Sequence, residues 1–156
     1  MSLARQKLGV ITFWLTWPGI WLVLRFSHRT RAVITCGDMV LVVRPWLGNG
    51  KWNLPGGGIK KNERPIDTII REIYEETKLS ISVNDLTQTV TRTYKSGGLR
   101  FSYYEFRASL LKMPELSPPS RELTDIAWIK ASSLNNGNAN TDVLTGIKDK
   151  VIHNLL

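Results

Sequence analysis

The sequence predicts an α+β fold in which antiparallel hairpins dominate the sheet. Two observations support this fold class. Short runs rich in β-branched and aromatic residues recur along the chain, and two pairs of them are joined by glycine-containing turns. Between these pairs lies a segment whose isoleucines have helical spacing, and a second helical segment ends the chain. The 156 residues suffice for one ordinary domain.

The composition supports a packed core and argues against several classes of protein. Hydrophobic residues make up 42% of the chain and charged residues 22%, so the chain is not wholly disordered. The single cysteine, Cys36, excludes an internal disulfide framework. Besides this cysteine, only two histidines are available as zinc ligands, which disfavours a zinc enzyme.

The net charge of +8 is concentrated at the N-terminus. Residues 1–31 contain five basic residues and no acidic one, whereas residues 32–156 contain 16 basic and 13 acidic residues. A uniformly basic protein would suggest a nucleic-acid partner, which stays open here. The uneven charge instead predicts two parts, a basic apolar leader over residues 1–27 and a nearly balanced domain over residues 28–156.

The leader contains 17 consecutive uncharged residues, 8–24, between Lys7 and Arg25. A helix of that length spans about 25 Å, which is short of the roughly 30 Å hydrocarbon core, and Pro18 would kink it. Its tryptophans and basic flanks suit a membrane surface. Two interpretations stay open. The leader is either a membrane anchor, as a short span or as a helix lying in the interface, with the domain attached to the inner face in the cytoplasm, or it packs on the domain or on a second copy of it. A cleaved signal is disfavoured, because no small-residue cleavage site precedes Arg25.

The domain is predicted to begin with a hairpin and a glycine-rich bend. Residues 32–36 and 39–44 are β-rich runs joined by a Gly-Asp turn. A loop follows over residues 45–50, and residues 51–54 are predicted as a short strand that ends at Pro-Gly-Gly-Gly.

Residues 65–77 are predicted as a helix. Pro65 suits the first helical position, and Asp67 places a negative charge in the first turn. Four isoleucines supply an apolar stripe. The remaining predicted elements are strands at residues 81–83, 87–95, 99–111 and 126–129, a loop at 114–120, a polar linker at 131–140 and a terminal helix at 142–155.

The chemically informative feature of this helix is a set of three glutamates. Glu72, Glu75 and Glu76 stand at i, i+3 and i+4, so a helix places all three carboxylates on one face. They form either a solvated face or a site whose repulsion is neutralised by basic neighbours or by a hard divalent cation. The preceding glycines allow the backbone to turn sharply and approach a ligand. Strand, bend and acidic helix together predict a pocket for a cation and a phosphate.

From Gly57 to Leu79 the sequence resembles the Nudix box of the Nudix (MutT-type) hydrolases. That box reads G-x5-E-x7-R-E-U-x-E-E-x-G-U, where U is a bulky aliphatic residue. Gly57, Glu63 and the run R-E-I-Y-E-E-T-K-L at residues 71–79 match it, except that Lys78 stands where the family has glycine. Residues 52–58 also resemble the lead-in to the box, and the resemblance covers roughly residues 30–156.

The resemblance implies an α/β/α sandwich around a mixed sheet. It also implies hydrolysis of a diphosphate that links a nucleotide to another moiety, with Mg²⁺ or Mn²⁺ required. By matching position, the metal ligands are Glu72, Glu75, Glu76 and the Gly57 carbonyl, and the supporting pair is Glu63 and Arg71.

The general base is the least defined part of this prediction. A divalent cation would neutralise the diphosphate and lower the pKa of a bound water, and a nearby carboxylate would accept its proton. The candidates, in order, are Glu76, Glu122 and Glu115.

The box does not identify the substrate. Trp46 and Tyr94 could stack a base and Arg92 could hold phosphates, but core packing and solvated strand faces explain these residues as well. The alternative function is a catalytically weak nucleotide- or RNA-binding module on a Nudix scaffold. Two features favour this alternative: the basic charge balance of the chain, and Lys78, for which the left-handed conformation at a helix end costs on the order of 1 kcal/mol.

Overall fold

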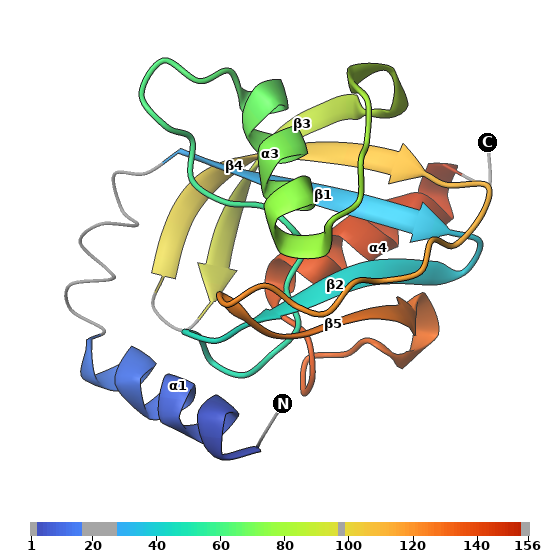
Figure 1. Ribbon diagram of the computed structural model, residues 1–156. Coiled ribbons are helices and arrows are strands. Elements are labelled where there is room, and N and C mark those ends of the chain that lie inside the picture. Colours follow the sequence, from blue (N-terminus) through green and yellow to red (C-terminus); the bar gives the residue numbers. More distant parts are fainter. Residues whose placement is uncertain (1–2, 17–27, 97–98, 154–156) are drawn as a thin grey trace.

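The computed structural model describes residues 3–16, 28–96 and 99–153 (Figure 1). Its centre is a five-stranded sheet with the order β3-β4-β1-β2-β5. β1 (Arg29–Cys36) pairs antiparallel with β2 (Met39–Pro45) and parallel with β4 (Leu99–Ser109). β3 (Thr87–Ser96) pairs antiparallel with β4, and β5 (Leu123–Lys130) pairs antiparallel with β2. The sheet is therefore mixed.

Two helices cover opposite faces of this sheet (Figure 1). On one face α3 (Pro65–Thr77) buries Ile69 and Ile73 in a cluster with Ile34. On the other face α4 (Thr141–His153) buries Val143 in a cluster with Val33. Because successive side chains of a strand point to opposite faces, β1 contributes to both cores. This arrangement confirms the predicted α/β/α sandwich around a mixed sheet.

The hairpin between β1 and β2 is confirmed, with Cys36 paired to Met39 and Gly37 at a φ of 58°. Residues 51–54 were predicted as a strand but form only isolated bridges, Asn53 with Val43 and Trp52 with Ala139. The segment divides its backbone hydrogen bonds between two different neighbours, so no continuous ladder forms.

The prediction of a strand at residues 81–83 is wrong. Val83–Asp85 form the short 3-10 helix η1 instead, because the Ser82 and Asp85 side chains exchange hydrogen bonds with each other's backbone and close a turn. The β-branched residues that suggested a strand do not overcome this local capping. The strand predicted at residues 126–129 is present and extends to the full length of β5.

The linker at residues 131–140 contains a second short 3-10 helix, η2 (Ala131–Ser133). The terminal helix is present as α4, which begins one residue before the predicted start; residues 154–156 lie outside the described residues.

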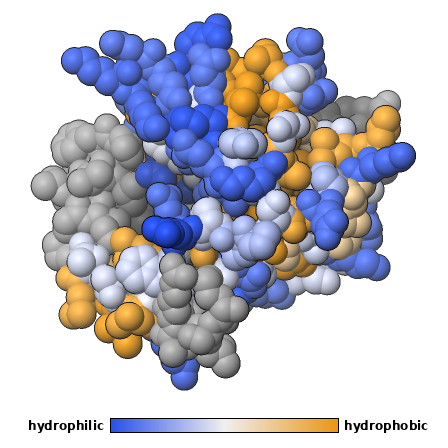
Figure 2. Space-filling model, viewed as in Figure 1, coloured by the Kyte–Doolittle hydropathy of each residue, from blue (hydrophilic) through white to orange (hydrophobic). Residues whose placement is uncertain are grey.

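The leader contains the helix α1 (Leu3–Leu15). It packs closely on the loop after β2, because a Cβ atom on Gly9 would collide with the backbone carbonyl of Trp46. Residues 17–27, with the predicted kink at Pro18, lie outside the described residues. Among the residues that the structure describes, no helix is both long and apolar enough to cross a membrane. Several apolar side chains of α1 face solvent, and Figure 2 shows such residues at the lower left.

Candidate active site

The glycine-rich bend fits tightly between β1 and α3. Gly56 has a φ of 137°, and a Cβ atom there would collide with the backbone of Thr30. A Cβ atom on Gly57 would collide with the carboxylate of Glu72. The Thr30 N–H donates to the Gly57 carbonyl over 2.9 Å, which fixes the bend to the first strand. Glycine is therefore required at both positions for the bend to lie against strand and helix.

The predicted Glu63–Arg71 pair is present and bidentate. Arg71 Nε donates to Glu63 Oε1 over 2.8 Å, and Arg71 Nη2 donates to Glu63 Oε2 over 3.0 Å. These hydrogen bonds lower the pKa of Glu63 to about 2. Arg71 Nη1 also donates to Glu72 over 2.7 Å and to Glu75 over 3.2 Å. The pair therefore ties the loop before α3 to the glutamates on the helix.

A cavity of about 240 Å³ lies where the bend meets the acidic face of α3. Two of the three predicted glutamates of the helix, Glu72 and Glu76, line it. The Glu122 side chain lines it from the loop before β5, and β1 contributes two arginines, Arg29 and Arg31. Carboxylates and cations thus share one small space.

The carboxyl group of Glu76 is the most perturbed acid in this cavity. Desolvation by the surrounding protein raises its pKa to about 8, and the neighbouring charges of Glu72 and Glu122 act in the same direction. The Gly56 N–H donates to Glu76 Oε2 over 2.9 Å, and Arg31 lies near enough to oppose part of the shift. Without a further cation, this group holds its proton at neutral pH.

The donor set suits a hard divalent cation. Mg²⁺ takes carboxylate oxygens, waters and substrate phosphates, and needs only one or two protein carboxylates. Glu72 and Glu76 supply these in the cavity, whereas Glu75 is 53% exposed and contacts Arg71 outside it. The Gly57 carbonyl accepts a hydrogen bond from Thr30 and retains a second lone pair. Within the described part of the chain, no three His, Cys, Asp or Glu side chains gather closely enough to hold a metal by themselves.

The other predicted site residues lie elsewhere. Glu115 is exposed on its loop and does not line the cavity. Tyr94 is buried against Phe101, and Arg92 Nε donates to the buried Glu105 over 2.6 Å. Trp46 is outside the lining, although its backbone N–H donates to the Glu122 carbonyl over 2.8 Å.

Sequence reasoning did not single out the two arginines of the cavity. Arg31 Nε donates to Asp142 Oδ2 over 3.1 Å, and its Nη1 donates to the Gly56 carbonyl, so it joins β1, α4 and the bend. Burial, with repulsion from Arg31, lowers the pKa of Arg29 to about 10. The available signal was their spacing, since basic residues two apart on a strand share one face.

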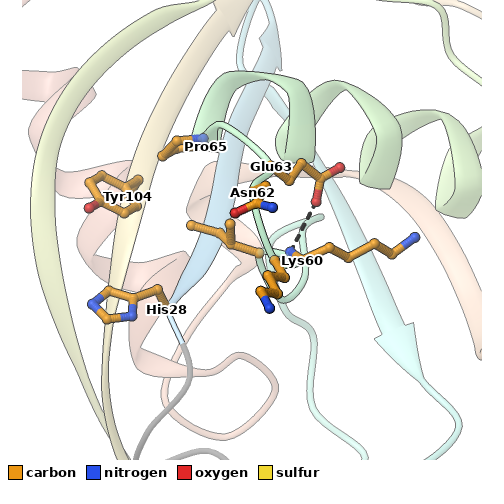
Figure 3. Close-up of a pocket in the computed structure, with 8 residues that line it drawn as sticks. His28, Lys60, Asn62, Glu63, Pro65 and Tyr104 are labelled. Carbon is orange, nitrogen blue, oxygen red and sulfur yellow. Dashed lines mark hydrogen bonds between the residues drawn. The ribbon is translucent and has the colours of Figure 1, made fainter.

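A second cavity, of about 460 Å³, lies beside the loop that leads into α3. Figure 3 shows His28 and Tyr104 on one side of it and Lys60 and Asn62 on the other. Glu63 also lines it, but the carboxylate of Glu63 is held by Arg71 and by the Lys60 N–H. The predicted glutamates of α3 are absent from its lining.

Comparison with known families identifies the domain. The family model described as "NUDIX domain" matches residues 26–153. The chain belongs to the Nudix family. Its fold is shared by the NUDIX domain of Shewanella oneidensis NrtR, crystallised with ADP ribose: the TM-score is 0.69 at 18% identity, over 83% of this chain and 88% of that one.

Two curated relatives match parts of this Nudix chain. An RNA pyrophosphohydrolase of Bartonella henselae is 38% identical over 55 residues, which are 35% of this chain and 32% of the relative. A MutT-like protein of Streptomyces ambofaciens is 40% identical over 67 residues, which are 43% of this chain and 44% of the relative. The chain thus spans less than half the length of each curated relative.

The one departure from the Nudix box is accommodated by the backbone. Lys78 adopts the left-handed conformation, with φ 61° and ψ 10°, and its N–H donates to the Tyr74 carbonyl over 2.9 Å. The helix therefore ends as it would with glycine, and the glutamates of the box stay on one face of α3. The Lys78 ammonium lies 5.2 Å from the centre of the Tyr74 ring, a contact that offsets part of the strain.

Proposed function

We propose that this Nudix hydrolase cleaves the diphosphate of a nucleotide linked to another moiety, and that it requires Mg²⁺ or Mn²⁺. The observation that supports this best is the pair Glu72 and Glu76 in one cavity beside Gly57. In the proposal these carboxylates hold the metal, with the Gly57 carbonyl as a further oxygen ligand. Glu75, the third glutamate that the box predicts as a ligand, contacts Arg71 outside the cavity and is not assigned to the metal. Such a cation neutralises diphosphate charge and lowers the pKa of a bound water.

The protein groups have separate tasks in this reaction. The Glu63–Arg71 pair holds the loop in register with α3 and fixes one oxygen of Glu72. Glu76 is the first candidate to accept a proton, because it lies in the cavity beside the proposed metal. Glu122 faces the same cavity from the loop before β5 and is the second candidate. Glu115 does not line the cavity and is therefore not proposed as the base.

The substrate class follows from the chemistry of the site and from the relatives. The matched proteins include an RNA pyrophosphohydrolase and a domain crystallised with ADP ribose, so the linked moiety in our proposal is a nucleoside or an RNA 5′ end. Trp46 lies outside the cavity lining but remains the proposed stacking residue, because its backbone N–H donates to the carbonyl of Glu122, which lines the cavity.

The test is a substrate panel with the full chain. It contains a nucleoside triphosphate, a dinucleoside polyphosphate, ADP-ribose and 5′-triphosphorylated RNA, each with Mg²⁺ or with EDTA. We expect metal-dependent release of phosphate or nucleotide, strongly reduced in Glu76→Gln and Glu122→Gln and unchanged in the control Glu115→Gln. Absence of metal-dependent turnover on every compound, or full activity of Glu76→Gln, would contradict the proposal. Tight binding in EDTA without hydrolysis would favour the binding module instead.

We also propose that α1 contacts an anionic membrane surface. Four of its apolar side chains are 54–78% exposed, Leu8, Ile11, Trp14 and Leu15, and Lys7 beside them is exposed. The full chain should co-sediment with vesicles that contain phosphatidylglycerol, and Leu15→Glu should reduce the fraction of protein that binds to them. Leu111→Glu, at an exposed leucine outside α1, is the matched control. Equal binding by all three proteins would reject the proposal, and concentration-dependent dimers abolished by Leu15→Glu would replace it.

A further inference from the structure

Arg29 is placed at the point where β1 meets the glycine-rich bend. The backbone of Arg29 forms an antiparallel bridge with Gly58, and the N–H of the adjacent Thr30 donates to the Gly57 carbonyl. Its side chain lines the same 240 Å³ cavity as Glu72 and Glu76. The first residue of the strand is therefore fixed by backbone contacts beside the proposed metal ligands.

The guanidinium of Arg29 lacks the partners that its neighbour has. Arg31, two residues along the same strand face, is paired with the buried Asp142 and with the Gly56 carbonyl. Arg29 Nε is buried without a hydrogen-bond partner, and Arg29 makes no ion pair with any described residue. A buried cation with unused donors is costly unless an anion binds to it.

One aromatic ring lies under this guanidinium, and a second ring supports the first. The central carbon of the guanidinium lies 5.6 Å from the centre of the Phe101 ring, and Phe101 stacks on Tyr94 with a centroid distance of 4.7 Å and an interplanar angle of 12°. Both rings are buried. An arginine stacked on a ring uses its face for that contact and keeps its in-plane N–H groups for a second partner. Planar N–H pairs of this kind match the oxygens of a phosphate.

We propose that Arg29 binds a phosphate of the substrate, with Phe101 as the platform that orients it. The proposal rests on the proposed function, because the phosphate that Arg29 binds belongs to a substrate held in the cavity that Glu72 and Glu76 also line. The phosphate then supplies the missing counter-charge and accepts the N–H groups that the protein leaves unused. In this proposal Arg29 determines specificity for phosphate, whereas the glutamates bind the metal.

The test measures binding without hydrolysis. Methylenediphosphonate, a diphosphate analogue that cannot be hydrolysed, is titrated calorimetrically into the full chain with Mg²⁺. Arg29→Met keeps the apolar stem on Phe101 but removes the charge, and should weaken binding about tenfold to a hundredfold. Arg29→Lys should be intermediate, because it keeps charge but not the planar pair of donors.

Arg44→Met is the matched control. Arg44 also stacks on a ring, 3.9 Å from the centre of the Trp52 ring, but it does not line the cavity. The Arg44→Met variant should bind the analogue with the same affinity as the original chain. Thermal unfolding of each variant establishes that it is folded.

A second readout separates phosphate binding from a merely structural role. Mn²⁺ binding without the analogue should be unchanged or tighter in Arg29→Met, because a positive charge beside the metal site is removed. Unchanged affinity of folded Arg29→Met for the analogue, no binding of the analogue by the original chain, or lost Mn²⁺ binding in the variant would each overturn the inference. If the analogue binds through Arg29 but no compound of the substrate panel is hydrolysed, the inference holds and the proposed function fails.

Discussion

Replacing Glu76 with glutamine is expected to change how the stability of the metal-free protein responds to pH. Folding raises the pKa of this group from 4.5 to about 8, so the folded protein keeps a proton that the unfolded chain releases. The resulting stability is fully present below pH 4.5 and is lost as the pH rises through 8. Between pH 7 and pH 9 the charged fraction in the folded state rises from about one tenth to about nine tenths. The corresponding loss of unfolding free energy is about 1 kcal/mol.

Urea denaturation of the full chain in EDTA, at pH 7 and at pH 9, measures this difference. Glutamine does not titrate, yet its carbonyl can still accept the Gly56 N–H, so the variant should lack the loss of about 1 kcal/mol. The other titrating groups are common to both proteins and cancel in the comparison. Saturating Mg²⁺ should reverse the loss in the original chain, because the metal binds the charged form. Parallel pH dependence of the two proteins in EDTA would refute the reasoning.

Three further predictions concern the surroundings of this group. Glu63→Gln should lower the free energy of unfolding by about 1–3 kcal/mol at pH 7, and the difference should vanish as the pH falls from 4.5 to 2, where the lowered pKa of Glu63 lies; denaturation at both ends of that range measures it. Gly57→Ala should displace the Glu72 carboxylate and weaken Mn²⁺ binding by at least about tenfold, because its Cβ atom has no room; a folded variant with unchanged affinity would be evidence against Glu72 as a ligand. Lys78→Gly should raise the unfolding free energy by about 0.5–1 kcal/mol by relieving the left-handed conformation; a thermal melt that shows no gain would mean that the Tyr74 contact offsets the strain completely.

Much of the fold was predictable because local patterns and the core agree. The isoleucine spacing, Pro65 and Asp67 locate α3 at its observed bounds, and the glycine turn locates the first hairpin. Residues 51–54 and 81–83 were wrongly predicted, since local hydrogen bonds decide them: the former bridge two neighbours, and Ser82 and Asp85 close a turn. The parallel pairing of β1 with β4 joins segments far apart in sequence, which no local pattern reports.

The candidate site was predictable only where the spacing is helical. The i, i+3, i+4 pattern places the glutamates on one face, but it does not tell that Glu72 and Glu76 enter the cavity while Glu75 stays outside. That division depends on how α3 packs against the bend. Arg29 reaches the cavity through strand pairing, and the aromatic candidate Tyr94 is drawn into a stack with Phe101. Tertiary contacts of this kind leave no periodic trace in the sequence.

The central claim is that Glu72 and Glu76 form a divalent-metal site in the cavity beside Gly57. Anomalous scattering from crystals of the full chain soaked in Mn²⁺ tests it most directly. The predicted result is a peak within about 2.0–2.3 Å of carboxylate oxygens of both residues, lost in crystals of Glu76→Gln. A fully occupied Mn²⁺ site elsewhere, with no peak in this cavity, would contradict the claim.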